Sequence, residues 1–221
     1  MLPDLPQTET AIVEMTNAFR KEHKLGEVRP NAALAAAARA FADYLAKSGT
    51  FAHEADGRQP HQRAEAHGYR YCLVAENLAM NLDSRGFATR QLALEAVEGW
   101  KSSPGHRANL LQAGVTEIGV AVVRVADKNP KFVSVQLFGR PASLKVAFSI
   151  TNRAGTPVRY SLGREQHTLP ARTTVTHTTC DPGRLGFDQV RGTAQFAPRD
   201  GDRFVARAGA AGAVEVDVAR K

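Results

Sequence analysis

Three short segments of the 221-residue chain hold residue types that could do chemistry. They are "FAHE" with His53, "VAENLA" with Glu76, and "WKSSPGHRANLL", in which Ser103 stands close to His106. A serine beside a histidine is the pairing used by serine hydrolases. Imidazole and carboxylate groups are also the donors that zinc takes from proteins. These residues therefore pose two questions, one about nucleophilic catalysis and one about a metal.

The serine-hydrolase interpretation is the weaker of the two. A catalytic serine needs a base, a third group that orients the base, and an oxyanion hole. Neither Ser102 nor Ser103 lies in a GxSxG elbow, and Ser103 is separated from His106 only by Pro104 and Gly105. We predict instead that Ser103 caps the backbone around a Pro-Gly turn, and that Gly105 adopts a conformation that would strain other residues.

His53, Glu76 and His106 suit a zinc site of the catalytic type, which has three protein donors and one open position. They are far apart in sequence and lack the local HExxH spacing, so their spacing is only a weak indication of a metal. An equally good interpretation is a metal-free network of hydrogen bonds that joins loops across a cleft, because buried polar groups must be paired. Both interpretations stay open.

Apolar residues at helical spacing predict four helices before residue 104. The first begins at Thr8 or Thr10 as N-cap and stops before Gly26. The second helix is expected to start after Asn31, a good N-cap, and to end at Gly49. The third and fourth cover residues 60–68 and 88–103, and Trp100 is expected to pack the fourth helix on a sheet. Asn77 and Asn109 are predicted to hold loop backbone.

Two strands follow, at residues 115–125 and 131–140, with a turn at 127–130. The first 141 residues therefore predict an α+β domain. In residues 142–221 apolar and polar residues alternate with period two, which predicts a small all-β domain, either a sandwich or a barrel. Its predicted strands are residues 146–150, 158–162, 171–178, 193–198, 203–208 and 213–220. His167 and His177, which have no partner cluster of Cys or acidic residues, are expected on strand faces, and Phe187, Phe196 and Phe204 in the core.

Four motifs in order, "FAHEADGRQPHQRAEAHGY", "VAENLA", "VEGWKSSPGHRANLL" and "EIGVAVV", resemble the bacterial branch of the CAP or SCP superfamily of cysteine-rich secretory proteins, antigen 5 and plant pathogenesis-related proteins. The resemblance covers about residues 8 to 140 and implies an α-β-α sandwich with a cleft. It implies that His53, Glu76, Ser103 and His106 line the cleft, and that His53 and His106 hold a divalent metal in those members that bind zinc. Ser103 stands where animal and plant relatives usually carry a second glutamate.

Charge and composition narrow the classes of partner. The net charge is +7, and residues 142–221 contribute 12 basic against 7 acidic side chains. The arginines are scattered and no RNA-binding motif is present, so we expect no nucleic-acid partner. No apolar stretch approaches the ~20 residues of a membrane span. Cys72 and Cys180 form one disulfide at most, and two free thiols are an equal alternative.

The resemblance implies an extracytoplasmic protein, secreted or periplasmic, although the start "MLPDLPQTET" shows no signal peptide. We expect it to bind a small molecule or lipid, a sterol, or an envelope or host-surface component through the cleft. The first alternative is a metal-assisted hydrolase of envelope or peptide-like substrates, with Glu76 as general base. The second is adhesion carried by the β domain. The question of catalysis stays open, and Ser103 in place of a second acid favours binding.

Overall fold

A computed structural model describes residues 2–220 except 182, 189, 191–194 and 211–212. The chain forms two compact units, Met1–Ala142 and Ser143–Lys221, and each is described by itself. The break comes one residue after the end predicted for the α+β domain. No helix in the described part of the chain is long and apolar enough to cross a bilayer.

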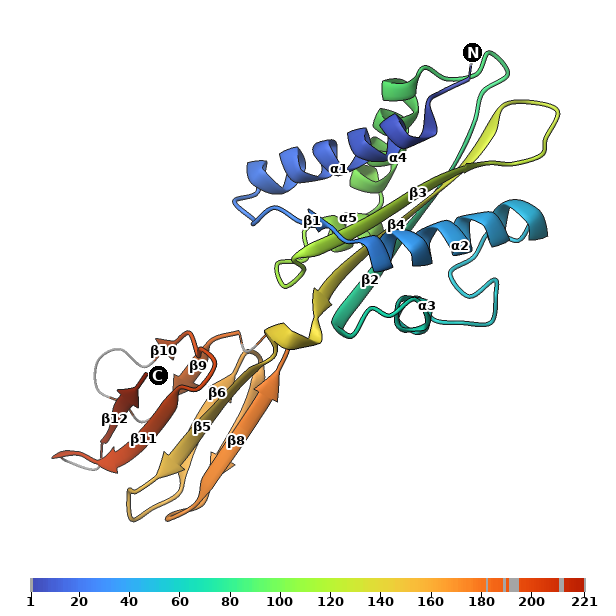
Figure 1. Cartoon of the computed structure of the whole chain (residues 1–221). Helices are drawn as coiled ribbons and strands as arrows, with labels where there is room; N and C mark the ends of the chain where they lie inside the picture. Colours follow the sequence, from blue (N-terminus) through green and yellow to red (C-terminus); the bar gives the residue numbers. More distant parts are fainter. Residues whose placement is uncertain (1, 182, 189, 191–194, 211–212, 221) are drawn as a thin grey trace. The chain divides into compact units, whose positions relative to one another are not determined.

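The first unit has three layers, with a four-stranded sheet in the middle (Figure 1). The strand order is β1-β3-β4-β2, so β2 is an edge strand. One apolar core joins α1 and α4 to one face of the sheet, and a second core joins α2 and α3 to the other. The predicted α-β-α sandwich is confirmed. The elements are α1 (Leu5–Glu22), β1 (Arg29–Pro30), α2 (Ala32–Ser48), α3 (Pro60–Ala66), β2 (Tyr71–Leu82), α4 (Thr89–Ser102), α5 (Pro104–Leu110), β3 (Glu117–Arg124) and β4 (Lys131–Pro141).

Capping side chains explain where the long helices begin and end. Asn31 accepts hydrogen bonds from two backbone N–H groups at the start of α2, and Gly49 ends that helix with a left-handed φ of 70°, as predicted. The predicted start of α1 was wrong. Asp4 is the N-cap, and its carboxylate accepts from the backbone N–H of Gln7 at 2.9 Å. Thr8 lies inside the helix and donates its hydroxyl to the Asp4 carbonyl instead.

The segment around Pro104 is helical, where the sequence predicted a turn. Pro104 lacks a backbone N–H, so it ends α4, but the same property suits the first position of the next helix, α5. Gly105 lies within α5, is not among the glycines with positive φ, and has open space where a Cβ would stand. The prediction of a special conformation at Gly105 was therefore wrong. Strand β2, which carries Glu76, was not predicted either.

The second unit is a β-sandwich, in agreement with the all-β prediction. Its sheets have the orders β10-β9-β6-β7 and β12-β11-β5-β8, and residues of both sheets share one apolar core. Residues 193 and 194 of one predicted strand lie outside the described residues. A short 3₁₀ helix, Ala142–Leu144, precedes the strands β5 (Val146–Asn152), β6 (Val158–Leu162), β7 (Glu165–Leu169), β8 (Thr174–Thr179), β9 (Leu185–Phe187), β10 (Gln195–Phe196), β11 (Arg203–Ala208) and β12 (Val214–Ala219).

Aromatic rings fill one part of this core. Phe187 and Phe204 are buried, and Phe196 packs against them at the margin, which agrees with the prediction for all three. His167 and His177 lie on strands β7 and β8, as predicted, and both contact Tyr160. The His177 Nε2 atom is 2.8 Å from the Tyr160 hydroxyl, and the His167 ring stacks on the Tyr160 ring. The partner is an aromatic residue on another strand, which a search for nearby cysteines and acids could not detect.

Candidate functional site

The carboxylate of Glu76 is the centre of a buried polar network in the first unit. Its side chain is only 1% exposed. One oxygen, Oε1, lies 2.8 Å from Nδ1 of His53, and the other, Oε2, accepts a hydrogen bond of 2.8 Å from the guanidinium of Arg63. Both oxygens of Glu76 are therefore committed to bonds within the protein.

Arg63 was not singled out from the sequence, yet it organises the loop that carries His53. Its side chain is 3% exposed, and the guanidinium lies over the ring of Phe41 at 3.5 Å. It donates to the carboxylate of Asp56 and to the backbone carbonyls of Arg58 and His53, besides Glu76. A buried carboxylate needs a cationic partner close to it. If Glu76 is expected to be buried, an arginine or lysine in contact with it is therefore also expected.

Asn77, the next residue of β2, binds the segment that carries His106, on the opposite face of the sheet from Glu76. Successive side chains of a strand point to opposite faces of the sheet. The Asn77 amide donates to the backbone carbonyl of His106 at 3.3 Å and to the side chain of Gln136 at 3.0 Å. Asn109 of α5 donates in turn to the Asn77 side chain and to the backbone carbonyl of Glu76. The two asparagines do bind backbone, as predicted, but they join a helix to a strand.

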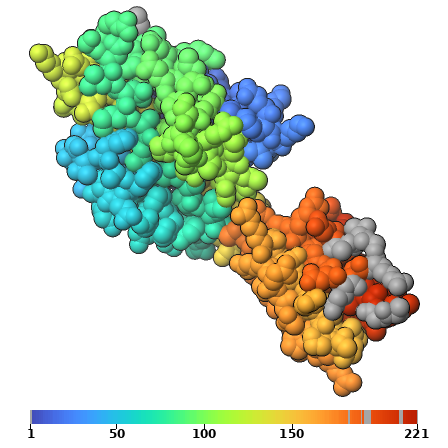
Figure 2. All heavy atoms as spheres, turned by 180° about the vertical axis from the view of Figure 1, so that it is seen from behind, coloured from blue at the N-terminus to red at the C-terminus, as the bar shows by residue number. Residues whose placement is uncertain are grey.

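These bonds bring His53 and His106 together. Their ring centroids are 6.3 Å apart and the rings are tilted by 51°. The side chain of His53 is half exposed, and that of His106 is partly buried. Figure 2 shows that α3 and α5, coloured cyan-green and yellow-green, both reach the surface on one side of this unit. The site is thus a pair of accessible imidazoles on a rigid, buried support.

The two histidines have opposite electrostatic surroundings. The hydrogen bond that His53 donates to the Glu76 carboxylate raises the pKa of His53 above its ordinary value, against a smaller effect of burial. Burial lowers the pKa of His106, and the neighbouring His53 lowers it further. At neutral pH an uncharged imidazole is favoured more strongly at His106 than at His53.

Ser103 does not act as the sequence predicted. Its backbone carbonyl accepts a hydrogen bond of 2.8 Å from the N–H of Arg107, but its side chain makes no capping bond to α5. Ser102 donates its hydroxyl to the carbonyl of Glu98. Within the described part of the chain, neither serine is hydrogen-bonded to a histidine, so no Ser–His pair is formed. Trp100 packs α4 on the sheet as predicted, and its ring N–H donates to the Leu78 carbonyl at 2.9 Å.

The order of these motifs matches a known family. Residues 13–138, more than half of the chain, match the cysteine-rich secretory protein family, CAP. The chain belongs to the CAP family. Its CAP domain is the first unit of the structure, and the second unit lies outside the matched residues.

Two bacterial proteins illustrate the extent of the similarity. Protein YkwD of Bacillus subtilis (strain 168) is 31% identical over 116 residues, which is 52% of this chain and 42% of YkwD. An extracellular protein with an SCP domain from Bacillus anthracis str. Ames is 25% identical, with a TM-score of 0.51 over 62% of this chain and 41% of that chain. The chain therefore spans less than half the length of either protein.

An outer surface protein from Borrelia burgdorferi has a similar fold. Its structure is 23% identical, with a TM-score of 0.52, over 61% of this chain and 92% of that chain. At this level of identity the likeness shows the CAP fold alone.

The donor set of the CAP domain fits a metal only in part. In the described ranges, no three or more His, Cys, Asp or Glu side chains are grouped so as to hold a metal. Glu76 is poorly placed as a ligand, because its side chain is buried and each oxygen already accepts a hydrogen bond within the protein. Two imidazoles bound to one tetrahedral zinc at ~2 Å from each nitrogen would have ring centroids about 5 Å apart. The observed 6.3 Å is close enough for a small side-chain movement to bring the rings to that distance.

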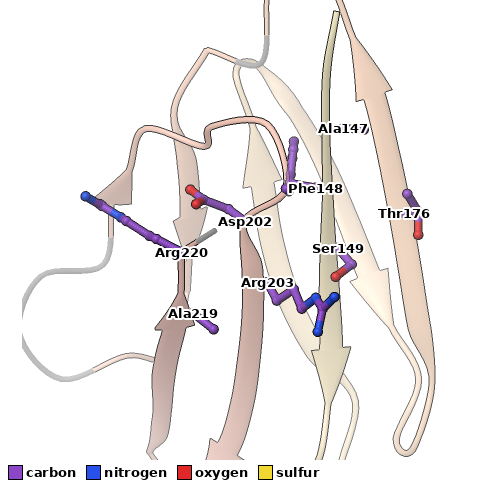
Figure 3. Close-up of a pocket in the computed structure, with 9 residues that line it drawn as sticks. Ala147, Phe148, Ser149, Thr176, Asp202, Arg203, Ala219 and Arg220 are labelled. Carbon is purple, nitrogen blue, oxygen red and sulfur yellow. The ribbon is translucent and has the colours of Figure 1, made fainter.

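A separate cavity of about 490 Å³ lies in the second unit (Figure 3). Its lining is mainly apolar, with several polar side chains on the β12-β11-β5-β8 sheet. Arg203, Ser149 and Thr176 stand side by side on three neighbouring strands, because Ser149 pairs in register with both of the others. Asp202 and Gly201 complete one end. Sequence reasoning placed no site here, because the strand pairing that aligns these residues is not a local property.

Proposed function

We propose that this CAP-family protein is a non-enzymatic binding protein that works outside the cytoplasm and takes its ligand at the surface around His53 and His106. The family resemblance suggests lipids, sterols, or envelope and host-surface molecules as ligand classes. The similarity to an extracellular SCP-domain protein from Bacillus anthracis str. Ames supports the location. The exposed imidazole of His53 on a buried support is suited to binding, since the support needs no rearrangement when a ligand arrives.

The burial and the hydrogen bonds of Glu76 are the main reason for proposing binding rather than catalysis. A general base must reach the water it deprotonates with a free oxygen. Glu76 is buried, and its two oxygens bond to His53 and Arg63. A metal-assisted hydrolase with Glu76 as base would have to expose this buried carboxylate to water. Ser103 supplies no second acid in its place.

We further propose that His53 and His106 hold a divalent metal, zinc being the first to test. The Nδ1 atom of His53 is hydrogen-bonded to Glu76, so its Nε2 atom is the one that can bind a metal. A carboxylate that orients a ligating histidine in this way is a common arrangement. A bound zinc would supply an electron-pair acceptor for an oxygen or nitrogen atom of the ligand. Glu76 and Arg63 would hold His53, and Asn77 would hold the backbone of His106.

Isothermal titration calorimetry with zinc chloride tests the metal. We expect saturable heat for the wild type and its loss in the double variant His53→Ala/His106→Ala. A double variant that removes two other histidines of the same unit, His23→Ala/His61→Ala, should bind zinc as the wild type does. Equal heat from all three proteins would rule out the proposed metal site.

Fluorescent analogues of cholesterol and of a fatty acid test the ligand class. Saturable binding that weakens in His53→Ala/His106→Ala supports a lipid or sterol at this surface. Binding that is the same in both proteins would place the ligand elsewhere on the chain. Hydrolysis of peptide or ester substrates by the wild type that His53→Ala/His106→Ala abolishes would overturn the non-enzymatic proposal.

Adhesion through the second unit is a second candidate, and the cavity at Arg203 supports it. A row formed by the guanidinium of Arg203 and the hydroxyls of Ser149 and Thr176 offers the donors and acceptors that bind the polar groups of a glycan. Pull-down with an insoluble bacterial cell-wall fraction tests this. Arg203→Ala should release the protein from the glycan, whereas Arg159→Ala, an exposed arginine of the other sheet, should not. Equal retention of the two variants would contradict adhesion at this cavity.

A further inference from the structure

Three alternate residues of β3 turn their backbone groups to the edge of the sheet. The Ile118 carbonyl accepts from the N–H of Asn31 at 2.8 Å. The Val122 N–H donates to the Glu9 carboxylate at 2.8 Å, and the Val122 carbonyl accepts from Arg39 at 2.7 Å. Every second residue of a strand bonds toward the same side. The N–H and C=O of Val120, midway between these two residues, therefore also face the edge.

Val120 differs from Ile118 and Val122 because no described residue of the protein covers its backbone at the sheet edge. Within the described part of the chain, neither its N–H nor its C=O has a hydrogen-bond partner at this edge, although the residue is only 7% exposed. The backbone groups of buried residues are nearly always paired. A donor and an acceptor left together beside a cavity are a specific feature that points to a ligand.

The cavity beside Val120 has a volume of about 400 Å³. This is within the range of sites for small organic molecules. Gly119 contributes to its shape, because a Cβ there would stand 2.2 Å from the backbone of Leu34, so only glycine lets α2 lie this close to β3. Its walls come from α1, α2, β1 and β3, and they are Pro6, Glu9, Thr10, Val13, Glu14, Pro30, Ala35, Ile118, Gly119 and Val120.

We propose that this cavity binds one apolar peptide residue, whose N–H and C=O exchange two hydrogen bonds with the main chain of Val120. One amino-acid residue carries a donor and an acceptor at the spacing that Val120 presents, as in a hydrogen-bonded pair of antiparallel strands. Paired side chains lie on the same face of a sheet. The apolar side chain of the ligand would then pack on the α1 side, near Val13.

The surroundings limit the ligand to a short, uncharged molecule. Glu9 and Arg39 form an ion pair that covers the strand at Val122, and Asn31 covers it at Ile118, so a longer partner strand has no room to continue. Glu9 and Glu14 are the only charged residues among the described ones that line the cavity, so an anion such as a fatty acid finds no cation there. A blocked amino acid or the apolar residue of a short peptide satisfies both conditions.

Titration of the ¹⁵N-labelled full chain with N-acetyl-leucine methylamide, followed by two-dimensional NMR, tests the proposal. We expect saturable shifts of the Val120 amide and of neighbouring amides of α2. The matched ester analogue, in which an oxygen replaces the leucine N–H, should bind at least tenfold more weakly, which corresponds to about 1.4 kcal/mol. Equal binding of amide and ester, or binding of laurate in preference to the amide, would overturn the proposal.

Two variants that fill the cavity from different walls locate the binding. Ala35→Phe from α2 and Val13→Phe from α1 should each weaken the amide at least tenfold. Ala36→Phe, on the exposed face of the same helix, should leave it unchanged. His53→Ala/His106→Ala should also keep the affinity, so this result is independent of the proposed metal site. Thermal denaturation confirms that each variant is folded, and undiminished binding by the folded filling variants would contradict the assignment.

Discussion

Glu76 and Asn77 are neighbours in one strand, and each holds a different histidine of the site. The Glu76 carboxylate bonds to the ring of His53 on one face of the sheet, and the Asn77 amide bonds to the backbone of His106 toward the other. Because β2 is an edge strand, the segments that it holds on its two faces can meet around that edge. The consecutive pair Glu-Asn therefore sets the separation of the two imidazoles.

Replacement of Glu76 by glutamine should strongly destabilise the fold. The substitution keeps the shape of the side chain but leaves the buried guanidinium of Arg63 without its carboxylate. Breaking a buried ion pair from one side costs about 3–5 kcal/mol. Urea denaturation measures the change, and Glu65→Gln, an exposed glutamate of α3, is the control. A loss below 1 kcal/mol would mean that Asp56 alone compensates Arg63.

The two histidines should titrate in a definite order. In the metal-free protein, NMR of the ring protons should give His53 a pKa above 6.5 and His106 a pKa below 6.5. The Glu76→Gln variant should lower the pKa of His53, because the charged hydrogen-bond partner is lost. The reverse order in the wild type would contradict the described hydrogen bond.

These shifts have opposite effects on stability. The folded state binds the His53 proton more tightly than the unfolded state does, so this contribution is present below pH 6.5 and is lost as pH rises through the folded pKa. The folded state binds the His106 proton more weakly, so protonation lowers stability as pH falls below 6.5. Urea denaturation of His53→Ala and His106→Ala across pH 5–8 should show the two pH dependences separately.

Gly119 should not tolerate alanine. The added Cβ would lie 2.2 Å from the backbone of Leu34, which cannot move aside as a flexible side chain would. Overpacking costs typically 1–3 kcal/mol, and contact with backbone places Gly119→Ala at the upper end, about 3 kcal/mol. Gly99→Ala in α4 is the matched control, because its Cβ meets nothing within 4 Å and helices favour alanine by up to about 1 kcal/mol. Thermal denaturation should give shifts of opposite sign.

Removal of the Asn77 side chain should loosen α5. Asn77→Ala leaves the buried amide groups of Gln136 and Asn109 without one partner each, which costs about 1–3 kcal/mol per group. We expect faster hydrogen exchange of the α5 amides, while those of α2 stay protected. Asn81→Ala, farther along the same strand, is the comparison. Unchanged exchange in α5 would show that Asn109 alone holds the helix through the Glu76 carbonyl.

Local signals in the sequence predicted much of the fold. The caps Asn31 and Gly49, the apolar spacing of α4 and the alternation of β3 and β4 were sufficient, because each depends on residues close together in the chain. Errors arose where one residue suits two structures. Pro104 ends a helix and also starts one, and the β2 segment carries polar residues on both faces that hide its strand pattern.

The sequence by itself determined the family, the α+β and all-β halves, and the residue types His53, Glu76 and His106 as a candidate site. Only the tertiary structure decided what those residues do. It showed that Arg63 and Asn77 complete the network, that Glu76 is buried with a hydrogen bond at each oxygen, and that Ser103 has no histidine partner among the described residues. It also showed the open edge at Val120. The physical reason is that hydrogen bonds and burial depend on segments far apart in the chain, whereas caps and periodicity depend on near neighbours.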